Sequence, residues 1–120
     1  MKENAVKDKS FKFAIRSVNL YKALSTSRKE FVICRQLLRS GTSIGANVRE
    51  GLNAQSDMDF IHKFSIAQKE CDESCYWLEL LQATEYISED EFASIYNDAT
   101  ELLKIIRSII LTKKQNIQKS

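Results

Sequence analysis

Residues 39–51 read RSGTSIGANVREG and contain all three glycines of the chain, Gly41, Gly45 and Gly51. The pattern on both sides of them is helical, and a glycine inside a helix costs about 1 kcal/mol relative to alanine. Gly41 and Gly45 are four residues apart, so both lie on one helix face and allow a second helix backbone to come close. We therefore expect the helix to continue through both glycines and to pack tightly against a neighbour.

Outward from this stretch, apolar residues recur at helical spacing in four segments. The expected helices run from Ser10 to Leu24, from Ser27 to between Gly51 and Asn53, from Ser56 past Leu81, and from Ser88 to about Leu111. A serine three residues before an acidic residue is the pattern of a capping box, in which each side chain satisfies a free amide at the helix start. It occurs at Ser27 with Glu30, Ser56 with Asp59, and Ser88 with Glu91.

The chain contains no proline and no segment of strand alternation, and all connections are short. Short connections place successive helices side by side and antiparallel. We therefore predict an all-α fold, an antiparallel up-down-up-down four-helix bundle, as a single domain over residues 1–120. Residues 1–9 are polar and lysine-rich, and residues 112–120 are basic, so both are expected to be flexible basic ends.

Several classes of protein are not expected. The longest apolar run, residues 105–111, is too short to span a bilayer, and the polar N-terminus lacks the apolar segment of a signal peptide. We therefore expect a cytoplasmic protein without membrane contact. Three cysteines are too few, and odd in number, for a secreted disulfide framework.

No metal site, cofactor or catalytic residue is expected. Cys71 and Cys75 are one helical turn apart, but no further ligand follows at a recognisable spacing, and His62 is the only histidine. The glycines do not follow a strand as in a phosphate-binding loop. Ser43 lacks the strand-turn-helix context of a nucleophile elbow. We therefore predict that the protein is not an enzyme.

Charge is divided strongly along the chain. Residues 1–55 carry eleven basic and four acidic side chains, net +7, and residues 56–120 carry seven and twelve, net −5. Four arginines lie along the expected second helix: Arg28, Arg35, Arg39 and Arg49. Arginines spaced in this way can meet successive phosphates of a nucleic acid. They can equally pair with the acidic residues of the third helix, and the sequence leaves both interpretations open.

Apolar residues exceed what one bundle core requires. Tyr76, Trp77, Leu80, Ile105 and Ile110 cannot all point into the same core. Contiguous exposed aromatic and aliphatic residues usually mark an interface. We predict a homo-oligomer whose interface includes Tyr76, Trp77 and Leu80, in preference to a monomer with a well-filled core.

Residues 39–51, together with NAQSDMDFIHKFSIA at 53–67 and YWLELL at 76–81, resemble the signature of a bacterial family. These are the four-helix-bundle proteins encoded in intervening sequences of 23S rRNA genes, and Val48 stands where the family commonly has isoleucine. The resemblance implies a homopentamer. It also implies similarity to the accessory variability determinant of diversity-generating retroelements, a basic bundle that binds nucleic acid and a reverse transcriptase. It marks six signature positions with structural roles: Gly41, Ser43, Gly45, Asn47, Glu50 and Gly51.

The sequence thus supports two hypotheses of different classes. The first is a non-enzymatic oligomeric bundle that binds RNA or DNA through Arg28, Arg35, Arg39 and Arg49. The second is a protein-interaction adaptor or scaffold that makes no direct contact with nucleic acid.

Overall fold

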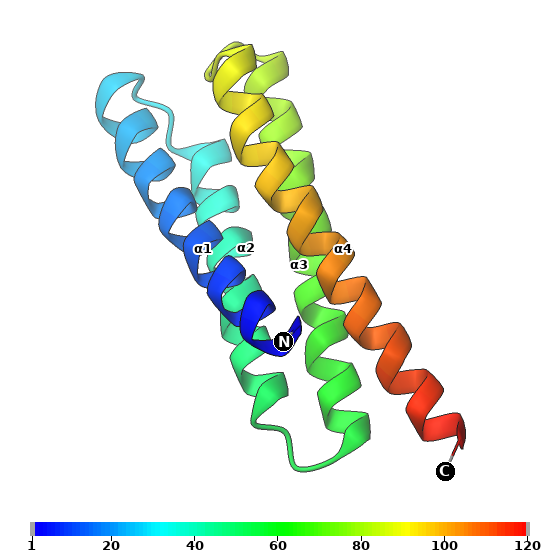
Figure 1. Cartoon of the computed structure of the whole chain (residues 1–120). Helices are drawn as coiled ribbons and strands as arrows, with labels where there is room; N and C mark the ends of the chain where they lie inside the picture. Colours follow the sequence, from blue (N-terminus) through cyan, green and yellow to red (C-terminus); the bar gives the residue numbers. More distant parts are fainter. Residues whose placement is uncertain (1, 120) are drawn as a thin grey trace.

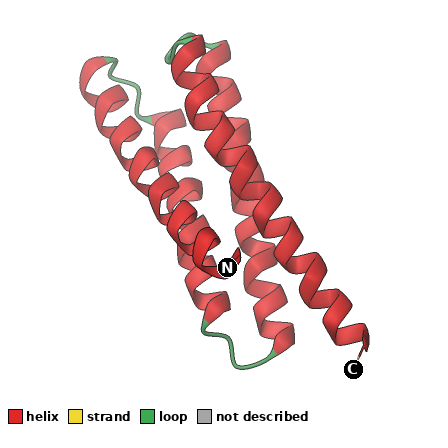
Figure 2. Cartoon of the chain, viewed as in Figure 1, coloured by secondary structure: helices red, strands yellow, loops and turns green. Residues whose placement is uncertain are grey.

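The computed structural model describes residues 2–119, which form four helices and no strand (Figure 1). Their bounds are α1 Lys2–Ser27, α2 Val32–Leu52, α3 Asp57–Ala83 and α4 Glu89–Lys119. Each helix runs antiparallel to the one before it, and short loops connect them (Figure 2). The predicted up-down-up-down bundle is therefore confirmed.

The helices form a closed ring around one core. Each packs on its neighbours in sequence, α1 also packs on α4, and diagonally opposite helices do not approach closely among the described residues. The contact between α2 and α3 is the most extensive, and that between α1 and α4 is the least. The centre is filled by large apolar side chains that are essentially inaccessible to solvent: Phe13, Leu37, Ile44, Phe64, Leu78, Leu81, Leu102 and Ile106.

The glycines of α2 allow two close helix contacts. A Cβ atom on Gly41 would lie 2.1 Å from Ser17 Oγ and 2.9 Å from Ser17 Cβ, and one on Gly45 would lie 3.4 Å from the Ser10 carbonyl oxygen. α2 continues through both glycines, so the predicted close approach is confirmed and the neighbour is α1. Gly51 adds a contact with α3 that the sequence did not indicate, since a Cβ there would lie 2.6 Å from the Phe64 ring.

Two of the three predicted helix starts have the expected hydrogen bonds. Ser88 and Glu91 form a reciprocal capping box, in which each side chain accepts from the other residue's backbone N–H at 3.1 Å. Ser56 Oγ accepts from the Asp59 N–H, also at 3.1 Å. Both helices therefore begin where the local sequence pattern places them.

The third predicted box, Ser27 with Glu30, is wrong. Ser27 is the last residue of α1, and its hydroxyl donates to the Ala23 carbonyl. The Glu30 carboxylate instead accepts the backbone N–H groups of Val32, Ile33 and Cys34 at 2.8–3.1 Å. A turn with positive φ at Lys29 precedes Glu30. One carboxylate can satisfy three free amides, which a serine hydroxyl cannot do.

The two ends are helical rather than irregular. α1 starts at Lys2, and the fully buried Val6 anchors its first turns in the core. α4 continues to Lys119, and Lys113 Nζ lies 3.1 Å from Asp57 Oδ1 and 4.5 Å from the centroid of the Phe60 ring. The described residues of the two ends that were expected to be flexible, 1–9 and 112–120, are therefore helical. Met1 and Ser120, which belong to these predicted segments, lie outside the described residues.

No helix in the described part of the chain is both long and apolar enough to cross a membrane.

Candidate nucleic-acid interface

The four arginines of the predicted site lie in three different environments. Arg28, in the loop before α2, reaches the turn between α3 and α4. Its Nη1 atom donates to the Glu85 carbonyl oxygen at 3.2 Å, and its guanidinium carbon lies 5.0 Å from the centroid of the Tyr86 ring. Arg28 therefore ties two loops together at one end of the bundle while its side chain stays exposed.

Arg39 is an ion-pair residue between α2 and α3. Its Nη2 lies 2.7 Å from Glu73 Oε1, and its Nη1 lies 3.6 Å from Glu70 Oε2. The same Glu73 oxygen accepts the Trp77 indole N–H at 3.1 Å. For Arg39, the alternative interpretation, pairing with acidic residues of the third helix, therefore matches the geometry. The same contact supplies the acceptor that the half-buried Trp77 needs.

Arg35 and Arg49 point to solvent. In the part of the chain that the structure describes, neither lies within ion-pair distance of a carboxylate. The Arg49 guanidinium carbon lies 5.3 Å from the centroid of the Phe11 ring, a side chain contributed by α1. These two arginines keep their hydrogen-bonding capacity for an external anion.

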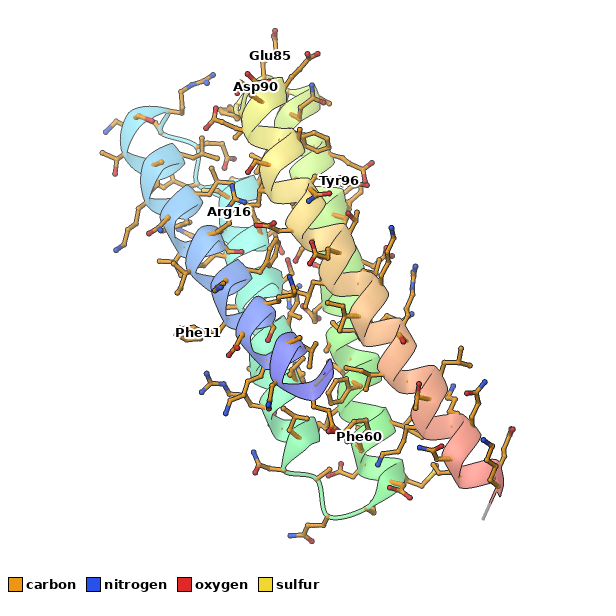
Figure 3. All side chains as sticks on the ribbon, viewed as in Figure 1. Phe11, Arg16, Phe60, Glu85, Asp90 and Tyr96 are labelled. Atoms are coloured by element: carbon orange, nitrogen blue, oxygen red, sulfur yellow. The ribbon has the colours of Figure 1, made fainter. Side chains whose placement is uncertain are left out.

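The lysines and arginines of α1 also fall into two groups, those that pair with a carboxylate and those that do not. Arg16 Nη1 donates to Asp98 Oδ2 at 2.6 Å and its Nη2 to Ser94 Oγ at 3.1 Å, and Lys9 pairs with Glu101. These contacts close the bundle between α1 and α4, where Figure 3 shows Arg16. The exposed cations of residues 3–55 that have no carboxylate partner within the described range are Lys7, Lys12, Lys22, Arg28, Lys29, Arg35 and Arg49.

The comparisons with known proteins identify the family. The family model described as 23S rRNA-intervening sequence protein matches residues 2–108. The chain belongs to this family. Among solved structures, it is similar to a protein of unknown function from the S23 ribosomal protein family of Bacteroides thetaiotaomicron. The two share 60% identity over 92% of this chain and 98% of that one, with a TM-score of 0.91. No protein with a curated description matches.

In this member of the 23S rRNA-intervening sequence family, the polar signature positions make contacts within the bundle. Ser43 Oγ donates to the Arg39 carbonyl at 2.6 Å, and Asn47 Nδ2 donates to the Ser43 carbonyl at 2.9 Å. Glu50 Oε1 lies 3.6 Å from Lys63 Nζ on α3. These contacts, like the glycine contacts above, lie within the bundle.

The predicted oligomer interface lies on α3 and is only partly exposed. Tyr76 is 57% exposed, and its ring meets the Trp77 ring edge-on with 4.9 Å between centroids. Trp77 and Leu80 are half-buried. Ile110 is buried in the core of this chain and Ile105 is half-buried, so the predicted apolar excess is smaller than the sequence indicated.

The cysteines are enclosed by the core rather than presented to a ligand. Burial raises the pKa of Cys34 and Cys71 to about 12 and that of Cys75 to about 11. All three thiols therefore stay protonated at neutral pH and are weak nucleophiles. In the described residues, no group of three His, Cys, Asp or Glu side chains is arranged to hold a metal ion, and His62 is exposed.

Sequence reasoning missed two features of this face. It did not identify Phe11 as the neighbour of Arg49, because that contact joins two helices and depends on their register. It also did not assign Lys9 and Arg16 to acidic partners on α4, although the opposite net charges of the two halves were a signal for such pairs.

Proposed function

We propose that this member of the family is a non-enzymatic, cytoplasmic homo-oligomer that binds RNA or DNA through the outer face of α1 and α2. One observation carries the proposal. The seven exposed cations named above lack carboxylate partners among the described residues, although twelve acidic side chains lie on residues 56–120. Lys9, Arg16 and Arg39 stabilise the bundle through ion pairs, and Arg28 does so through the Glu85 carbonyl and the Tyr86 ring. The proposal therefore rests mainly on the other six cations.

The geometry favours contact with the phosphate backbone rather than with base edges. Arg35 and Arg49 are fourteen residues apart on one helix, so their Cα atoms are separated by about 21 Å along the axis. Guanidinium groups bind phosphate through two parallel hydrogen bonds. Binding of this kind depends little on sequence and strongly on salt. The family description, which refers to 23S rRNA, is compatible with such a ligand.

The test is a fluorescence anisotropy titration of labelled RNA and DNA at low and raised salt. We expect the double substitution Arg35→Gln with Arg49→Gln to weaken binding about tenfold at low salt and to reduce the dependence of log K on log salt by about 1 to 2 units. The matched control is Lys104→Gln with Arg107→Gln, two exposed cations on α4, and it should change binding little. Absence of binding even at low salt would reject the proposal.

A second candidate function is a protein-interaction adaptor without nucleic-acid contact. The exposed Tyr76 on α3, beside Trp77 and Leu80, favours it, because these residues form a surface for another polypeptide or another copy of the chain. Light scattering after size exclusion measures the assembly. The family resemblance implies a pentamer, and the substitution Tyr76→Asp should lower the measured mass if this surface joins the copies.

A further inference from the structure

Phe11 is an aromatic side chain displayed on the basic face. It is 53% exposed, and Figure 3 shows it projecting from α1 away from the bundle. By contrast, Phe60 and Phe64 stack on each other in the interior with 4.4 Å between ring centroids. The Arg49 guanidinium lies over the Phe11 ring. A ring held beside an arginine, and still half open to solvent, can accept a further flat group.

The residues around this ring suit a strand of nucleic acid. On α1, Lys7 and Ile15 lie one turn before and one turn after Phe11, and both are exposed. Asp8 is the single acidic side chain within one turn of Phe11 along the helix. The surface is therefore apolar at its centre and cationic at the Arg49 end.

The helix register places two more cations at the opposite end of this surface. Gly45 lies against Ser10 and Gly41 against Ser17, so α1 and α2 run past each other in opposite directions. Arg35 precedes Gly41 by six residues on α2, and Lys22 follows Ser17 by five residues on α1. Because the helices are antiparallel, both lie toward the same end of the pair. Both are exposed and without a carboxylate partner among the described residues. Cations thus flank the apolar centre on both sides.

We propose that this surface, formed by Lys7, Phe11, Ile15, Lys22, Arg35 and Arg49, selects single-stranded nucleic acid over duplex. This inference rests on the proposed function and names its substrate class. An unpaired base stacks on the Phe11 ring while the flanking cations bind phosphates, an arrangement that tolerates any base because every base has a π face. In a duplex the bases stack on each other, and their faces cannot reach the ring.

A preference for single strands would distinguish base stacking on Phe11 from binding by charge alone, because charge alone favours the duplex. A duplex carries one phosphate per about 1.7 Å of axis, more than a single strand, so a purely electrostatic face binds the duplex at least as tightly. The test is anisotropy with a labelled strand of about twelve nucleotides, free and annealed to its complement, at one salt concentration, in RNA and DNA forms. We expect Phe11→Leu to weaken single-strand binding about tenfold and to leave duplex binding nearly unchanged.

Two further variants complete the experiment. Phe11→Tyr keeps the ring and should retain the preference. Met58→Ala truncates an exposed apolar side chain on α3, a helix that does not contact α1 among the described residues, and should not alter the preference.

The outcomes separate the two proposals. Duplex bound as tightly as single strand, or equal losses for both in Phe11→Leu, would overturn the selectivity and leave the proposed function standing. A changed oligomeric mass for Phe11→Leu would show that this face joins copies of the chain. That result would also overturn the proposed selectivity. No binding of either form would reject both.

Discussion

At the scale of single residues, the two central glycines look equivalent in sequence and differ in the structure. A Cβ on Gly41 would overlap Ser17 Oγ and approach Ser17 Cβ at 2.9 Å, whereas one on Gly45 meets Ser10 at 3.4 Å or more, an ordinary contact. The close approach of α1 and α2 therefore depends mainly on Gly41.

This difference predicts the effect of alanine at each position. Gly41→Ala should lower the free energy of unfolding by about 1–3 kcal/mol, because the helices must move apart. Gly45→Ala should be within about 1 kcal/mol of the wild type, since better helix propensity offsets the tighter contact. Urea denaturation of the two variants measures this. Equal losses at both positions would contradict the account of the helix contact.

Glu30 is the second residue whose role the structure defines. Burial raises the pKa of its carboxyl, but the backbone N–H groups of Cys34, Ile33 and Val32 lower it more, so the pKa lies below its ordinary value. A carboxyl whose pKa is lower in the folded state contributes stability above its unfolded pKa of about 4.3. That contribution is lost as pH falls through the folded value.

Glu30→Gln should therefore change the pH dependence of stability. Between neutral pH and about pH 3 the wild type should lose more unfolding free energy than the variant, since only the wild type has this carboxyl to protonate. At neutral pH the variant should be less stable by about 1 kcal/mol, a typical value for a weakened helix cap. Thermal melts across this pH range provide the measurement. Parallel curves for the two proteins would show that Glu30 does not cap α2 as a carboxylate.

At the scale of helices, α2 and α3 are joined by a buried polar contact in addition to the ion pairs that Arg39 and Glu50 make with α3. Ser40 Oγ and Ser74 Oγ lie 2.8 Å apart, both fully buried, and Ser74 also donates to the Glu70 carbonyl at 2.9 Å. Ser40 Oγ in turn lies 3.4 Å from the Leu37 carbonyl oxygen, so either hydroxyl can be the donor in the pair. The contact therefore links the two helices at one buried point.

A double-mutant cycle tests this pair. Ser40→Ala and Ser74→Ala should each destabilise the protein by about 1 kcal/mol, and the double variant should cost less than the sum because neither hydroxyl is then left unpaired. Chemical denaturation of the four proteins gives the coupling energy. Strict additivity would show that the two hydroxyls do not interact.

Helix boundaries were predictable where the signal is local. The caps at Ser56 and Ser88 depend on residues three apart and were found from the sequence. The start of α2 depends on a positive φ at Lys29, and the start of α1 depends on the burial of Val6 alone among polar neighbours. Neither feature follows from a pattern of residues three or four apart, so the cap of α2 was misassigned and the start of α1 was placed too late.

At the scale of the whole molecule, some cations of the basic half form ion pairs with the acidic half, and others remain on the outer face. Arg35 and Arg39 cannot be distinguished by residue type or local pattern, yet Arg39 pairs with Glu73 while Arg35 faces solvent. Which arginines remain available for a ligand follows from helix rotation and register. The sequence therefore predicted the line of arginines but not that Arg39 pairs with α3 while Arg35 and Arg49 remain unpaired among the described residues.

The closed core also predicts thiol reactivity. Cys34, Cys71 and Cys75 are at most 5% exposed, and burial raises the pKa of each to about 11 or 12. At pH 8 a disulfide reagent should modify the folded protein far more slowly than the urea-unfolded protein, in which all three thiols should react. Absorbance of the released thiol follows the reaction. Rapid reaction of the native protein would contradict a closed four-helix core.

The most direct measurement of the central claim is lysine acetylation footprinting by mass spectrometry, with and without single-stranded RNA at low salt. The account predicts that RNA protects Lys7, Lys22 and Lys29 on the outer face of α1 and the adjoining loop. It also predicts that Lys69, Lys104 and Lys114 on α3 and α4, which are exposed as well, are modified equally in both samples. Protection confined to α3 and α4, or no protection on any lysine, would contradict it.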